Sequence, residues 1–188
     1  EGTELFDKGN LFYSRRVGST FGSVDYDDDK EEVISKPVSA NLLNAVKLTG
    51  RNKKGLGLGV FNAITNKTHA KIKNLESGEE REVQVDPLTN FNVAVVEQNL
   101  KNNSFVNFTN TNVTRAEGGR DANVSGLTVS VNDKSLKYRV RAFGGYSMVN
   151  QKNDEGRFAT KPGYKYSLDL GKVSGTWQYG LSRVGETE

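Results

Sequence analysis

A run of carboxylates between residues 25 and 32 supplies a concentrated group of potential metal ligands. It contains Asp25, Asp27, Asp28 and Asp29, followed by a lysine and two glutamates. Several carboxylates on one loop suit a hard cation such as Ca²⁺. The run lacks the ordered spacing and the turn glycine of an EF-hand loop. A solvated loop is therefore the favoured interpretation, and a calcium site is the weaker alternative.

Catalytic and metal-binding side chains of other kinds are scarce. The chain has one histidine, His69, and no cysteine, which excludes a histidine cluster, a thiol nucleophile and a zinc-thiolate site within this sequence. His69 follows the turn residues Asn66, Lys67 and Thr68, so we expect a surface histidine. No spacing among the 23 acidic residues singles out an acid and a nucleophile for glycoside hydrolysis. The sequence predicts neither a catalytic centre nor a cofactor.

Glycines recur at every second position in the segment Gly55, Gly57 and Gly59. A glycine-rich phosphate loop needs a helix directly after it, and the residues that follow read as a strand. Glycine within a strand instead marks close strand packing or space for a bulky neighbouring side chain. We expect one of these two roles here.

Charged residues alternate with apolar ones, which predicts a sheet with two faces of different chemistry. Tyr138 and Val140, for example, alternate with Arg139 and Arg141. Such a polar face either attracts anionic solutes or pairs its basic residues with Asp169 and nearby carboxylates, and pairing is the favoured alternative. With 26 basic and 23 acidic residues and a net charge of +3, the chain is too balanced for a nucleic-acid-binding groove.

From about residue 41 onward, apolar side chains recur at every second position in segments of about ten residues, as in β-strands with one apolar face. Residues 1–40 lack a sustained period and read as a lead-in segment with an acidic loop, and residues 41–188 as the strands of one domain. The expected hairpins pair residues 44–50 with 55–64, 69–73 with 83–85, 90–98 with 104–111, 121–131 with 137–146, and 163–172 with 173–182. The fold class is therefore all-β, an antiparallel hairpin meander.

Two architectures share this alternation. A soluble β-sandwich buries the apolar faces in a core, whereas a transmembrane β-barrel turns them to lipid and turns its polar face to a wet lumen. Strands of about ten residues exceed the usual five or six and favour the barrel. The lipid-facing candidates are then Val46, Leu48, Leu56, Leu58, Val60, Tyr164, Tyr166, Leu168, Leu170, Trp177 and Tyr179. The lumen-facing candidates are Lys47, Arg51, Arg139, Arg141, Lys165 and Asp169.

The opening of the chain carries a more specific signal than its periodicity. Residues 1–18 (EGTELFDKGNLFYSRRVG) are followed by AVKLTGR at 45–51, GLGLG at 55–59, NAIT at 62–65 and DPLTN at 86–90. These segments resemble the N-terminal part of a C-terminal outer-membrane β-barrel domain of unknown function, found downstream of a family 9-type carbohydrate-binding domain. The resemblance covers most of the chain, and the family's barrel domain is several times longer.

The resemblance implies an outer-membrane location and a structural, transport or surface-binding role in a Gram-negative-type envelope. The implied partners are outer-membrane lipid, the remaining strands of a larger barrel or a partner chain, and glycan. The alternatives are a secreted soluble β-sandwich that binds glycan or protein, and part of a carbohydrate-active surface protein.

Overall fold

The computed structural model describes residues 4–8, 11–12, 17–19, 22–118, 120–152 and 157–187. Its elements are α1 (Glu4–Asp7), β1 (Glu31–Ser35), β2 (Leu42–Arg51), β3 (Leu56–Thr65), β4 (Thr68–Asn74), β5 (Glu80–Asp86), β6 (Thr89–Asn99), β7 (Phe105–Arg115), the 3₁₀ turn η2 (Ala116–Gly118), β8 (Asp121–Asn132), β9 (Tyr138–Lys152), β10 (Phe158–Lys172) and β11 (Tyr179–Glu186). No helix in these ranges is long and apolar enough to cross a membrane.

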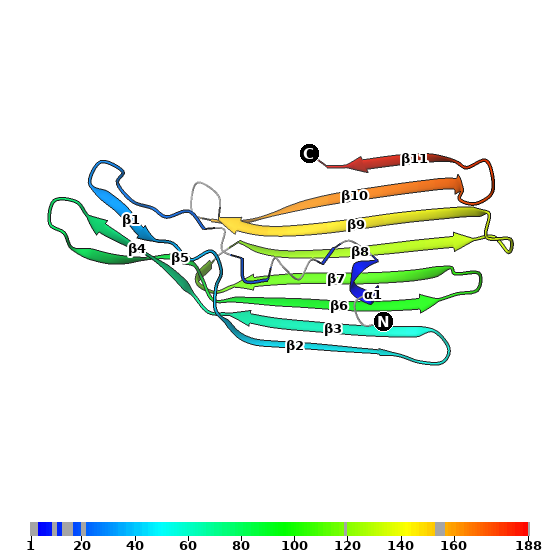
Figure 1. Cartoon of the computed structure of the whole chain (residues 1–188), viewed down its shortest axis with the longest axis horizontal. Coiled ribbons are helices and arrows are strands. Elements are labelled where there is room, and N and C mark those ends of the chain that lie inside the picture. Colours follow the sequence, from blue (N-terminus) through cyan, green and yellow to red (C-terminus); the bar gives the residue numbers. More distant parts are fainter. Residues whose placement is uncertain are drawn as a thin grey trace.

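Two antiparallel sheets make up the fold (Figure 1). The larger sheet has eight strands in the order β11-β10-β9-β8-β7-β6-β3-β2, and the smaller has three in the order β1-β4-β5. The hairpin β4-β5 leaves the large sheet after β3 and returns into β6, which pairs directly with β3. The predicted all-β antiparallel meander is confirmed. The sheet does not close into a barrel, since β2 and β11 are not paired with each other within the described residues.

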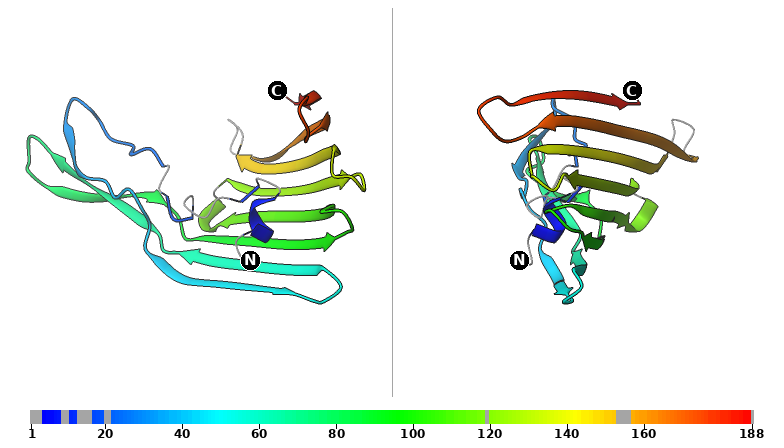
Figure 2. Two further views of the ribbon diagram at one scale, coloured as in Figure 1. Left: turned by 45° about the vertical axis from the view of Figure 1, so that its right-hand side comes forward. Right: turned by 90° about the vertical axis from the view of Figure 1, so that its right-hand side faces the viewer.

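The large sheet is twisted and curved, and α1 lies on the inside of the curve (Figure 2). We call this side the inner face and the opposite side the outer face. The three-stranded sheet extends beyond one end of the large sheet (Figures 1 and 2). The buried core sits on the inner face, where Leu5 and Phe6 of α1 pack with Val93 and Val95 of β6.

Tight turns join consecutive strands at the end of the large sheet away from the small one (Figure 1). Between β6 and β7, Asn102 and Asn103 have φ values of 57° and 54°. Two successive left-handed residues match the twist of a hairpin, and asparagine tolerates this conformation better than most residues. This local chemistry fixes the register of the β6-β7 pair.

Three expectations about the elements were wrong in detail. The segment 1–40 contains a strand, β1. The strand shows no clear alternation in the sequence because it has only five residues, three of them polar or charged. The same segment contains the four-residue helix α1, which is too short to show a helical period. The last strand begins at Tyr179 and not at Val173, so Trp177 lies in the β10-β11 turn.

Candidate functional site

Much of the outer face of the eight-stranded sheet is apolar, and no described residue covers it. A row of cross-strand neighbours through its middle contains Leu58, Val96, Phe108, Leu127 and Tyr166. Their exposed fractions lie between 40 % and 52 %. Soluble monomers rarely expose a continuous apolar patch of more than a few hundred Å². A face of this kind needs an apolar environment or a partner.

Tyrosines lie toward both ends of this apolar face. Tyr138 at the start of β9 and Tyr179 at the start of β11 are both cross-strand neighbours of Lys172 on β10, beside the turns that precede these two strands. Further along β9, Tyr146 pairs with Tyr164 on β10. All four tyrosines are exposed. Their amphipathic rings suit the boundary between an apolar and a polar environment.

Asparagines cover the outer face on the side of the three-stranded sheet. Asn62 Nδ2 donates to Oδ1 of Asn90 at 2.7 Å and to Oδ1 of Asn92 at 2.8 Å. Asn110 Nδ2 donates to Oδ1 of Asn123 at 3.1 Å. These side-chain hydrogen bonds run across neighbouring strands. They mark a change from an apolar to a polar surface along β3, β6, β7 and β8.

Ten of the eleven lipid-facing candidates lie on this outer face. They are Val46, Leu48, Leu56, Leu58, Val60, Tyr164, Tyr166, Leu168, Leu170 and Tyr179. The exception is Trp177, which is 80 % exposed in the β10-β11 turn. Their contact with lipid stays a prediction.

The inner face is built around the N-terminal residues. A Cβ atom on Gly57 would lie 2.8 Å from Leu5 Cδ2, and one on Gly59 would lie 3.0 Å from Phe6 Cζ. A larger residue at either position would require Leu5 or Phe6 of α1 to shift. Of the two roles expected for the strand glycines, Gly57 and Gly59 have the second, since each makes space for a bulky side chain. Leu5 and Phe6 are consequently only 2 % and 1 % exposed.

A buried carboxylate lies next to the place where α1 packs on β3. Glu97 on β6 has no exposed side-chain surface, and its Oε1 accepts a hydrogen bond of 2.6 Å from Arg51 Nη2. Lys8 Nζ lies 3.0 Å from Oε1 and 2.9 Å from Oε2 of the same carboxylate. Asn107 Nδ2 donates to Oε2 at 3.4 Å. A buried charge is stable only when paired and hydrogen-bonded, as here.

The remaining contacts of Lys8 come from other strands. Its Nζ lies 4.3 Å from the centroid of the Phe105 ring on β7, within the range of a cation-π interaction. Arg141 Nη2 on β9 donates to the Lys8 carbonyl oxygen at 3.1 Å. One residue of the N-terminal segment is thus bound by side chains from several strands of the large sheet.

All six lumen-facing candidates lie on the inner face: Lys47, Arg51, Arg139, Arg141, Lys165 and Asp169. Lys165 Nζ pairs with Glu186 Oε2 at 2.6 Å, as the pairing alternative expects. Asp169 instead accepts a hydrogen bond of 2.6 Å from the Ser182 hydroxyl. Lys47 Nζ lies 4.8 Å from the Phe6 ring centroid. Whether this face borders a lumen stays a prediction.

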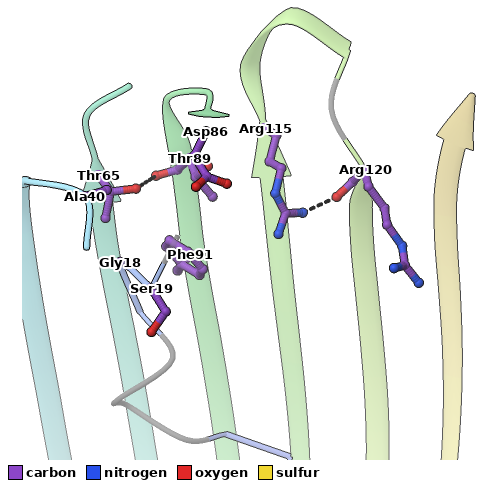
Figure 3. Close-up of a pocket in the computed structure, with 9 residues that line it drawn as sticks. All are labelled: Gly18, Ser19, Ala40, Thr65, Asp86, Thr89, Phe91, Arg115 and Arg120. Atoms are coloured by element: carbon purple, nitrogen blue, oxygen red, sulfur yellow. Dashed lines mark hydrogen bonds between the residues drawn. The ribbon is translucent and has the colours of Figure 1, made fainter. Parts of the chain in front are cut away.

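A pocket of about 320 Å³ opens where the strands meet the small sheet. Its lining includes Phe91, Asp86, Arg115 and Arg120 (Figure 3). The Arg115 guanidinium reaches the carbonyl oxygen of Arg120 (Figure 3). Among the described residues, Asp86 Oδ2 is buried without a hydrogen-bond partner, as is Thr68 Oγ1 on the paired strand. Water or a small polar solute would satisfy both atoms.

The acidic run and His69 bring no metal site together. Asp27 Oδ1 accepts a hydrogen bond from the Asp29 amide at 3.1 Å, a local turn contact of the calcium candidates Asp25, Asp27, Asp28 and Asp29. No group of three or more histidine, aspartate or glutamate side chains is arranged to hold a metal in the part of the chain that the structure describes. His69 lies on β4 of the three-stranded sheet and is half-buried.

Two carboxylates outside the large sheet have strongly perturbed acidities. The side-chain hydrogen bond from Arg81, helped by the Asp27 amide, lowers the pKa of Glu31 to about 2. In the β8-β9 turn, hydrogen bonds from Ser135 and from the Tyr138 amide lower the pKa of Asp133 to about 2. Both carboxylates fix local structure at opposite ends of the molecule, Glu31 through Arg81 and Asp133 through the Tyr138 amide.

The comparison with protein families matches residues 1–188 to the family described as Domain of unknown function (DUF5916). The chain belongs to this family. A comparison with curated proteins gives no significant match. A comparison with solved structures gives none either. Membership covers the whole chain, and the function has to be argued from the two faces of the sheet.

Sequence reasoning missed the Glu97 cluster. Glu97 is the one acidic residue in the segment 90–98. It is two positions from Val95 and four from Val93, so the three residues lie on the same face of the strand. An acidic residue in phase with an apolar stripe signals a buried ion pair. Its partner Lys8 lies 89 residues away, so spacing alone could not identify the pair.

Proposed function

We propose that this chain forms the first strands of an outer-membrane β-barrel in a Gram-negative-type envelope, with a structural, transport or surface-binding role. The main supporting observation is that the two faces differ in residue type. The outer face exposes leucine, valine and tyrosine, while the inner face, beside the apolar residues that pack with α1, fully buries Glu97, Asn107 and Thr109. Polar side chains inside and apolar ones outside are the pattern of a barrel in lipid.

The length of the apolar stretch on one strand, β9, supports this proposal, although the stretch is shorter on β6 and β7, where asparagines follow it. On β9 the outer positions from Tyr138 to Met148 are aromatic, apolar or glycine. These ten residue steps span about 34 Å along the strand at about 3.4 Å each, which at a strand tilt of about 40° gives a band about 26 Å tall. The apolar band of outer-membrane barrels is about 25 Å tall. The tyrosines at its two ends would lie at the interfaces with the headgroups.

Completion of the barrel defines the expected partners. Among the described residues, the edge strands β2 and β11 each pair with a strand on one side alone, and a lipid environment does not tolerate unpaired backbone groups. Further strands of a longer protein, or of a partner chain, would pair with these edges. The resemblance adds a family 9-type carbohydrate-binding neighbour, so glycan belongs to the proposed surroundings.

A second candidate is a secreted β-sandwich that binds glycan or protein. The exposure of Trp177 (80 %) and Tyr179 (65 %) at one turn favours it, since exposed aromatic rings stack on sugar faces. This candidate requires a second apolar layer over the outer face.

Membrane fractionation of the full-length protein that contains this chain tests the proposal. We expect the protein in the outer-membrane fraction, resistant to extraction by urea or carbonate and dependent on detergent for a β-rich circular-dichroism spectrum. A protein that is monomeric and β-rich in detergent-free buffer would overturn the membrane proposal and favour the sandwich.

A further inference from the structure

The ammonium group of Lys8 is bound on the inner face as a small ligand would be. The carboxylate of Glu97 lies within 3.0 Å of Lys8 Nζ, and the Phe105 ring centroid lies 4.3 Å from it. A carboxylate combined with an aromatic ring is a common receptor for organic cations, because the two provide charge and a polarisable face. Lys8 belongs to a short segment outside the sheet, whereas both receptor residues belong to adjacent strands, β6 and β7.

We propose that Glu97 and Phe105 form a binding site for primary alkylammonium groups on the inner face, in which Lys8 is a tethered resident ligand. The site takes the aliphatic ammonium of an amine, a polyamine or a lysine side chain. A soluble ligand of this class competes with Lys8 and thereby loosens the N-terminal segment from the sheet. The proposal concerns the inner face alone and does not depend on what covers the outer face.

The receptor half of the site is preorganised by residues other than Lys8. Arg51 Nη2 holds Glu97 Oε1 at 2.6 Å, and Asn107 Nδ2 contacts Glu97 Oε2 at 3.4 Å. These two donors fix the position of the carboxylate independently of Lys8. Positioning of this kind lowers the cost of ordering a binding group and so favours ligand affinity.

The site is accessible from one side. The Lys8 side chain is 27 % exposed, while that of Glu97 is fully buried. A ligand therefore approaches along the path of the lysine side chain, with its ammonium leading. Shortening Lys8 to alanine removes three methylene groups and the ammonium, which together have the size of n-propylammonium. That cation is the matched probe.

The test uses Lys8→Ala in the full-length protein, in detergent if its fold requires detergent. Binding of n-propylammonium is measured by saturation-transfer NMR at constant ionic strength, with neutral 1-propanol as the ligand control. We expect saturable binding to Lys8→Ala, and at least tenfold weaker binding to Lys8→Ala/Glu97→Gln and to the wild-type protein. Lys101→Ala, which shortens an exposed lysine of the β6-β7 turn, is the matched variant and should behave as wild type.

Equal binding to Lys8→Ala and to Lys8→Ala/Glu97→Gln, or equal binding of propanol and propylammonium, would overturn the proposal. A second measurement on the wild-type protein covers the case in which Lys8→Ala does not fold. n-Propylammonium should raise the rate at which a low concentration of protease cleaves the N-terminal segment, in a concentration-dependent way, and 1-propanol should not. An unchanged cleavage rate at saturating amine would contradict the proposal. Membrane fractionation is a separate measurement, so failure of either proposal can be recognised by itself.

Discussion

Replacing Leu58 by arginine distinguishes a lipid-facing from a water-facing outer face. Leu58 lies in the middle row of that face and is 52 % exposed. Arginine at the bilayer midplane destabilises an outer-membrane barrel by about 2–4 kcal/mol. The lost contact of a half-exposed leucine adds about 1 kcal/mol. The sum, about 3–5 kcal/mol, lowers the folding equilibrium constant by at least about 100-fold, at about 1.4 kcal/mol per factor of ten.

The assay is equilibrium unfolding in guanidinium of the full-length protein in phospholipid vesicles, followed by tryptophan fluorescence and by heat-modifiable mobility on gels. Leu75→Arg is the matched control, because Leu75 is 56 % exposed and lies in the β4-β5 turn. On an exposed surface in water, a substitution of this kind changes stability by about 0.5 kcal/mol or less. If Leu58→Arg is as stable as Leu75→Arg, the outer face does not meet lipid and the reasoning is wrong.

Three further outcomes follow from the described contacts. Phe6→Ala leaves a cavity against Gly59 and should lower the free energy of unfolding by about 3–5 kcal/mol in denaturant titrations. Unchanged stability would mean that α1 does not pack on the sheet. Gly59→Val should release the N-terminal segment to proteolysis at low protease, while the same change at Gly50, which meets no atom within 4 Å, should not. The folded pKa of Asp133 lies below its ordinary 3.8, so its contribution to stability is complete above that value and is lost as the pH falls toward about 2. In thermal unfolding over this pH window, Asp133→Asn should therefore lose less stability than the wild-type protein. An identical pH profile for the two proteins would contradict the turn contacts of Asp133.

The alternation of apolar and polar residues was sufficient to predict the outer face. On β2, β3 and β10 the outward-facing and inward-facing residues differ in type, as Leu168 and Asp169 do, so alternate positions can be assigned to opposite faces. On β6 this method is insufficient, because both sets are apolar: Val93 and Val95 face inward, and Ala94 and Val96 face outward. Which set is buried depends on α1, a contact between distant parts of the chain.

The packing of α1 on β3 shows what local sequence patterns cannot predict. Gly57 and Gly59 indicated that something bulky lies against β3, and the structure identifies it as Leu5 and Phe6. A helix of four residues has too little periodicity to be recognised. Its position is fixed by the glycine spaces and by the pairing of Lys8 with Glu97, both of which appear only in three dimensions.

The direct pairing of β3 with β6 has a consequence for how such a protein can grow. Ten residue pairs join these strands, from Leu56 with Gln98 to Thr65 with Thr89. The whole excursion from Asn66 to Leu88 therefore enters and leaves at one rim of the sheet without shifting its register. A rim that accepts a complete hairpin can accept longer insertions by the same route. New surface modules can thus be acquired, exchanged or lost during evolution while the apolar outer face stays continuous.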